Sequence, residues 1–64
     1  MVAPPGAERT LPYVLQRARR LRSLAEECRD LAQYLHFRPD RERVLEMARQ
    51  HDAEAARLEA TAQD

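Results

Sequence analysis

Residues 31–44 read LAQYLHFRPDRERV, and Pro39 within them divides the chain into two amphipathic segments. Apolar residues recur at helical spacing on both sides of this proline. Before it they are Val14, Leu21, Leu24, Cys28, Leu31 and Leu35, with Ala18, Ala25 and Ala32 beside them; after it they are Val44, Met47, Ala48, His51, Ala55, Leu58 and Ala62. The residue before a proline disfavours helical backbone angles, so Pro39 separates two helices. The sequence predicts an all-α, antiparallel two-helix hairpin with helices over about 11–36 and about 39–62.

The first residues differ in composition from the rest of the chain. Residues 1–9 contain two of the four prolines and the only glycine. We therefore expect residues 1–9 to be a disordered N-terminal segment and the hairpin to occupy residues 10–64. Thr10 is a suitable N-cap, and Pro12 is compatible with a first helical turn because the amides there have no intrahelical partner.

The size of the chain favours association. It has 64 residues, and single cores below about 70–80 residues rarely supply more than about 3–5 kcal/mol. One cysteine excludes an internal disulfide, and no metal-ligand spacing is present. The apolar stripe of the first helix is also wide, about 140°, and an alanine-rich second helix cannot cover it. We predict a homodimer, most simply a four-helix bundle, with an interface formed by Leu21, Leu24, Cys28, Leu31, Leu35, Val44, Met47 and Leu58.

Charge and hydropathy limit the range of partners. The chain has eleven Lys plus Arg, all of them arginine, and eleven acidic residues, so its formal net charge is zero. This neutrality gives no general attraction to nucleic acid or to an anionic membrane. No apolar run reaches the length of a membrane span, and the first residues do not resemble a signal peptide. A lone thiol is typical of a reducing compartment, so we expect a cytoplasmic protein without a membrane partner.

A local motif resembles a known group of proteins. Residues 25–32 read AEECRDLA, which is similar to an A-E-E-C-R-x-L-A pattern of short bacterial helical-hairpin proteins. Residues 45–51, LEMARQH, resemble the L-x-x-M-A-x-x-Y pattern of their second helix, with His51 in place of the aromatic residue and with Leu45 one residue nearer to the methionine than in the pattern. Those proteins usually have a small polar or acidic residue before the hinge proline, where this chain has Arg38. The resemblance implies a helical hairpin and brings no activity with it.

Cys28 and His51 are the two soft metal-ligand types on the apolar stripes. Cys28 is expected to act as a small core hydrophobe; the alternatives are a cysteine at a dimer axis, able to cross-link, and a reactive thiol. A Cys–His pair supplies two ligands, whereas a structural zinc site needs four, which only a dimer would provide. His51 is expected to lie at the edge of the helix seam. We predict no metal and no cofactor.

The arginines Arg19, Arg20 and Arg22 suggest an alternative function. Together with Arg17 they form a basic stretch that could contact phosphates in a small dimeric nucleic-acid-binding regulator. However, an antiparallel second helix brings acidic residues beside this stretch, and no aromatic residue lies between the arginines to stack on bases. Arg17 falls within the apolar stripe and is expected to pair with Glu59 or with a carboxylate of a partner. We therefore do not expect a nucleic-acid partner.

The carboxylates are spaced for surface ion pairs. Four pairs lie at helical neighbour spacing: Arg22–Glu26, Glu26–Arg29, Glu46–Arg49 and Glu54–Arg57. No glutamate has a histidine three residues later, as di-iron bundles require. No polar groups converge on a pocket. The sequence thus favours a non-catalytic, self-associating protein–protein interaction module: an adaptor, a regulator or an accessory subunit. Tyr34 and Phe37 near the hinge add a candidate aromatic patch for a partner protein.

Overall fold

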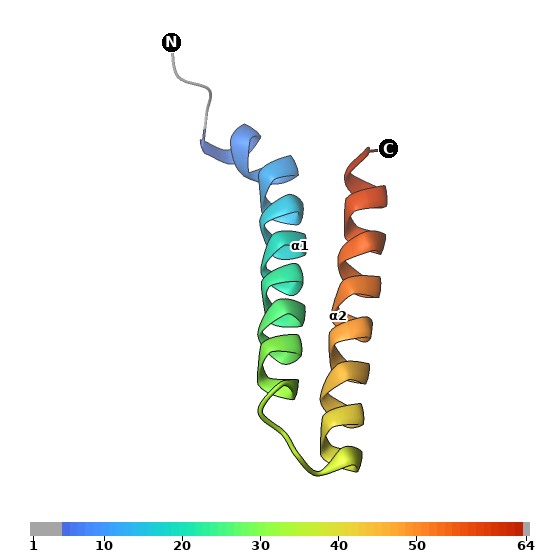
Figure 1. Ribbon diagram of the computed structural model, residues 1–64. Helices are drawn as coiled ribbons and strands as arrows, with labels where there is room; N and C mark the ends of the chain where they lie inside the picture. Colours follow the sequence, from blue (N-terminus) through green and yellow to red (C-terminus); the bar gives the residue numbers. More distant parts are fainter. Residues whose placement is uncertain (1–4, 64) are drawn as a thin grey trace.

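A computed structural model of the chain describes the backbone of residues 5–63 and the side chains of residues 13–62. It contains helix α1 (Pro5–Ala32) and helix α2 (Arg38–Gln63), joined by a short turn. The two helices lie side by side and run in opposite directions, so the two ends of the chain are at the same end of the hairpin (Figure 1). The predicted all-α two-helix hairpin is confirmed.

Helix α1 begins earlier than predicted. It starts at Pro5 instead of about Leu11, so residues 5–9, which we expected to be disordered, lie within the helix. Proline is compatible with the first helical residue because its missing amide would have no partner there. The first turns of α1, drawn in dark blue, lie at an angle to the rest of the helix (Figure 1). Pro12 lacks an amide hydrogen for the helical ladder, which accounts for such a bend. The remainder of the predicted disordered segment, residues 1–4, lies outside the described residues.

Helix α1 also ends earlier than predicted, at Ala32 instead of about His36. The amides of Gln33, Tyr34 and Leu35 each donate to the carbonyl three residues earlier, at 3.2, 3.0 and 3.2 Å. Such tighter bonds are typical of the last turn of a helix, where the final carbonyls lack α-helical partners. The reversal of the chain therefore takes up residues 33–37, before the proline is reached.

Helix α2 begins at Arg38, one residue before Pro39, and agrees with the prediction to within one residue at each end. The amide of Arg41 donates to the carbonyl of Phe37 at 3.1 Å, which closes the first turn. Pro39 is favourable there because its amide is not needed, and Asp40 lies near the positive end of the helix.

The core of the hairpin consists of alanine. Among the residues whose side chains are described, the buried apolar ones are Ala18, Ala25, Ala32, Ala48 and Ala55, and no larger side chain is fully buried. On each helix these alanines are seven residues apart, which is two turns and so the same side of the helix. Their methyl side chains allow the two backbones to approach closely. Leu24, Leu31 and Met47, which share the apolar stripes, remain exposed.

The hairpin is a single layer of two helices. Its Cα atoms extend over 54 × 21 × 11 Å, so the molecule is thin in one direction. Each broad side of the layer therefore consists of one flank of α1 and one flank of α2. The two broad sides differ in chemistry.

Candidate interaction surface

One broad side of the hairpin is held by ion pairs between the helices. Arg22 of α1 pairs with Glu59 at 2.7 Å and with Asp52 at 3.3 Å, and Arg29 pairs with Asp52 at 2.9 Å. Arg22 and Arg29 are seven residues apart on α1, as are Asp52 and Glu59 on α2. The ion pairs therefore lie in a row beside the alanine core. They establish the antiparallel register of the two helices, and they identify the flank of each helix that lies on this side of the hairpin.

These contacts change the acidity of the two carboxyl groups. The hydrogen bond from Arg29 lowers the pKa of Asp52 below its ordinary value of 3.8, and Arg22 adds a smaller contribution. The hydrogen bond from Arg22 lowers the pKa of Glu59 below its ordinary value of 4.5. Desolvation opposes both effects and does not cancel them. The ionised forms of Asp52 and Glu59 are thus favoured in the folded hairpin.

Acid is expected to weaken the hairpin through these two groups. Because their folded pKa values are lowered, their stabilisation is fully present above the unfolded values of 3.8 and 4.5 and is lost as pH falls through the lower folded values. Thermal unfolding followed by circular dichroism should give a melting temperature that falls between about pH 5 and pH 2, and Asp52→Asn should reduce this acid-dependent fall. Glu46→Gln, which leaves the inter-helix ion pairs intact, is the control. An equal fall in Asp52→Asn and wild type would contradict the expectation.

The other broad side of the hairpin is apolar. At about 100° per residue, Leu21 and Cys28 lie about 40–60° from the alanine line of α1, on the side opposite to Arg22. Val44 and Met47 lie on the corresponding flank of α2, which is the flank opposite to Asp52. We call this surface the apolar face; it comprises Leu21, Leu24, Cys28, Leu31, Val44, Met47 and Leu58. The eighth predicted interface residue, Leu35, lies in the turn, after α1 has ended.

The residues of the apolar face are incompletely covered by the single chain. Leu24, Leu31 and Met47 are 38%, 52% and 44% exposed, and the other five predicted interface residues are half-buried. Isolated exposed leucines are common on protein surfaces, but here they gather on one side of a thin layer. Helical spacing thus puts seven of the eight predicted interface residues on one side of the hairpin.

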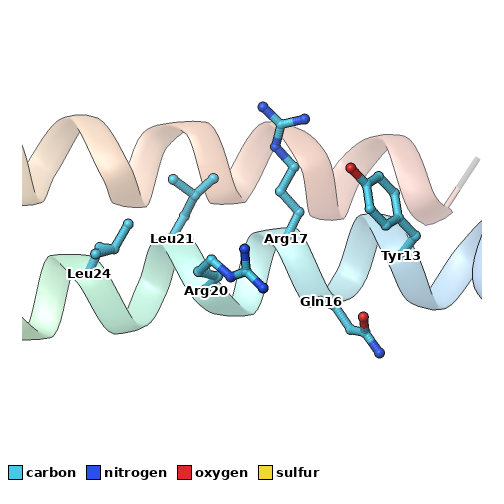
Figure 2. Close-up of a pocket in the computed structure, with 6 residues that line it drawn as sticks. All are labelled: Tyr13, Gln16, Arg17, Arg20, Leu21 and Leu24. Carbon is cyan, nitrogen blue, oxygen red and sulfur yellow. The ribbon is translucent and has the colours of Figure 1, made fainter.

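A shallow groove of about 290 Å³ extends this face toward the start of α1. It is lined by Tyr13, Gln16, Arg17, Arg20, Leu21 and Leu24, all of which belong to one helix. The side chains of Tyr13, Arg17 and Leu21 project from α1 in the direction of α2, whereas Gln16 points away (Figure 2). Sequence reasoning missed Tyr13 and Gln16 as surface-forming residues, because a groove depends on where neighbouring side chains end.

The arginines of α1 fall into two groups. Arg22 is neutralised by Glu59 and Asp52, whereas Arg17, Arg19 and Arg20 make no ion pair with any described residue. The expected pairing of Arg17 with Glu59 within the chain is wrong. Arg17 lies on the side of the apolar face, opposite to the carboxylate that Arg22 holds. Arg19 and Arg22 lie on the other flank of α1 from Arg20, so the structure does not gather the predicted nucleic-acid contacts into one patch.

Cys28 and His51 lie on the same side of the hairpin. The ion pair between Arg29 and Asp52 gives the local register and puts Cys28 within about one helical turn of His51 along the axis. Both residues are half-buried, and Cys28 is a free thiol. Within the described part of the chain, no group of three or more His, Cys, Asp or Glu side chains is arranged for a metal ion.

Two large aromatic side chains are exposed at the hinge end. Tyr34 is 76% exposed and Phe37 is 63% exposed, so the predicted aromatic patch is accessible at the turn. The local ion pairs Glu46–Arg49 and Glu54–Arg57 are confirmed along the outer side of α2. The predicted pair of Glu26 with Arg29 is also confirmed, at 3.1 Å. The predicted pair of Arg22 with Glu26 is wrong, because Arg22 pairs with Asp52 and Glu59 of α2 instead.

The comparisons with known proteins give no family assignment. No family model matches the chain, and neither a curated protein nor a solved structure shows significant similarity to it. Neither of the described helices contains an apolar stretch long enough to span a bilayer.

Proposed function

We propose that this protein is a small, non-catalytic, self-associating interaction module. Two hairpins would pair through their apolar faces and form a four-helix bundle. The observation that carries this proposal is the segregation of side chains: the ion pairs of Arg22 and Arg29 occupy one broad side of the hairpin, and the seven residues of the apolar face occupy the other.

The alanine core supports the need for a second molecule. Burial of apolar surface stabilises a fold by about 25 cal/mol per Å², and an alanine side chain contributes little area. The leucines that would normally supply a core, Leu24 and Leu31 among them, remain partly exposed in the single chain. A hairpin of this composition gains most of its available hydrophobic stabilisation only when the apolar face is covered.

The exposed area is large for a chain of this mass. The chain exposes 5319 Å², whereas a compact monomer of 7.4 kDa would expose about 4,200 Å². The difference reflects the thin two-helix shape, which encloses little interior. A second copy can cover the face symmetrically because a two-fold axis repeats the same patch on both subunits.

The proposal leaves a surface for another protein. After pairing, the outer sides of the bundle would carry the charged residues. Such a small particle fits the role of an adaptor, a regulator or an accessory subunit.

Sedimentation equilibrium combined with circular dichroism tests the proposal. At about 10–100 μM we expect a mass of twice the 7.4 kDa of the chain, and dilution should lower the mass and the helicity together. This coupling follows because the single hairpin lacks a large buried core. A fully helical monomer at these concentrations would contradict the proposal.

A further inference from the structure

We infer that the groove in the first half of α1 is a docking site for an acidic, amphipathic helix of another protein. The groove has a volume of about 290 Å³ and is open, because all six residues that line it belong to one helix. The inference rests on the proposed function as an interaction module, and it adds a second surface and the chemistry of the partner for that surface.

The groove carries two positive charges that no described carboxylate neutralises. Arg17 and Arg20 line it and make no ion pair with any described residue. Residues 9–25 contain no acidic residue, so no carboxylate of α1 lies within one helical turn of either arginine. The second half of α2 has three carboxylates, and arginines already hold all of them in ion pairs: Asp52, Glu54 and Glu59. The groove is therefore positive and accessible to acidic groups from outside the chain.

The apolar side chains of the groove lie in a row with its charges. Tyr13, Arg17, Leu21 and Leu24 follow one another at spacings of three or four residues, so they form a ridge along one flank of α1 (Figure 2). Two helices pack by placing such a ridge of one helix between the ridges of the other. A helix along this ridge can cover Leu21 and Leu24 with its own leucines. Its carboxylates, one turn further along, can then pair with the two arginines.

A second copy of the chain is a poorer match for the groove. On α1 it offers only one described carboxylate without an ion pair on the flank of the apolar face, Glu27, because Asp30 lies on the flank that carries the ion pairs. On α2 it offers Asp40, which three arginines surround in the sequence, so the hinge end is not acidic. An acidic helix of another protein can supply two carboxylates one turn apart, as the groove requires.

Nucleic acid is disfavoured as the occupant. Arg19 lies on the other flank of α1, so the arginines do not follow one path along which a phosphate backbone could bind. The apolar ridge also has no counterpart in a phosphate backbone.

Fluorescence anisotropy with synthetic peptides tests the inference. The probe is a fluorescein-labelled peptide of repeated heptads Glu-Ala-Leu-Glu-Glu-Leu-Ala, and the control peptide has glutamine in place of each glutamate. We expect the wild-type chain to bind the acidic peptide at least about 10-fold more tightly than the control peptide, because only the acidic peptide forms charged pairs with the arginines. Equal affinity for the two peptides would overturn the inference.

Arg20→Glu and Arg19→Glu are a matched pair of variants, because they make the same charge change in adjacent residues on different flanks of α1. Arg20→Glu should weaken binding of the acidic peptide at least about 10-fold, whereas Arg19→Glu should weaken it less than about 3-fold. Arg17→Gln combined with Arg20→Gln introduces no negative charge and should weaken binding at least about 5-fold with unchanged helicity. Equal losses in Arg19→Glu and Arg20→Glu would indicate general charge attraction and overturn the inference.

Sedimentation of the same samples separates this inference from the proposed self-association. A wild-type monomer that binds the acidic peptide through Arg20 would overturn self-association and support the docking site. If Arg20→Glu dissociated the dimer without peptide and Arg19→Glu did not, a second copy would occupy the groove and the inference would be wrong. Tighter binding of oligouridine or of phosphatidylserine vesicles than of the acidic peptide, lost in Arg20→Glu, would assign the groove to phosphate groups and overturn it as well.

Discussion

Leu24→Glu is expected to convert the proposed dimer to a monomer and to lower its helicity. In the single hairpin Leu24 is 38% exposed, so a glutamate there would remain hydrated and cost the isolated chain little. In a dimer the same carboxylate would be buried against the second copy without a partner, and the substitution would occur twice. We expect self-association to weaken by at least about 30-fold, the scale of an interface hot spot of about 2 kcal/mol.

The measurement is sedimentation equilibrium with circular dichroism at the same concentrations. Ser23→Glu is the matched control, because Ser23 is exposed on α1 and lies on the side away from the apolar face. It introduces the same charge one residue earlier and should retain the dimer. If Leu24→Glu sedimented as the wild type does, the apolar face would not be the dimer interface.

Ala25→Leu is expected to destabilise the hairpin itself. Ala25 is 0% exposed and lies between the two helices, where a leucine would force them apart and displace the ion pairs of Arg22 and Arg29. Overpacking of this kind typically costs about 1–3 kcal/mol. For a domain of this size the melting temperature should fall by at least about 5 °C.

The matched control for this prediction is Ala53→Leu on α2. Ala53 is exposed, so the added carbons would extend into solvent and the melting temperature should change little. Thermal unfolding of both variants by circular dichroism, at equal concentration, gives the comparison. An unchanged or higher melting temperature in Ala25→Leu would show that the alanines do not set the spacing of the helices.

The helices themselves were largely predictable, because their signals are local. The apolar spacing and Pro39 were enough to predict the hairpin, and α2 was predicted to within one residue at each end. The limits of α1 were not. Pro5 and Gly6 suggested a disordered segment, although the first residues of a helix need no amide partners. The last predicted turn became part of the chain reversal, because the tighter bonds from Gln33, Tyr34 and Leu35 end the helix at Ala32.

The sequence predicted which residues could form the candidate surface, but it did not predict which of them point toward the other helix and which point outward. Periodicity grouped alanines and leucines into one stripe, since both are apolar and lie within about 140° of each other. It also suggested that Arg17 pairs with Glu59, whereas Arg22 holds that carboxylate. The two pairings differ by a rotation of α1 about its own axis of some tens of degrees. No local sequence pattern specifies that rotation.

By itself the sequence determined two amphipathic helices, their antiparallel order and the residues available for association, because these depend on spacing along the chain. Only the tertiary structure decided which part of each stripe faces the other helix. Close approach is possible only along the methyl groups of alanine, and the pairs from Arg22 and Arg29 hold the helices in that rotation. This rotation turns Leu24, Leu31 and Met47 outward onto one side, since the other side is already occupied by ion pairs.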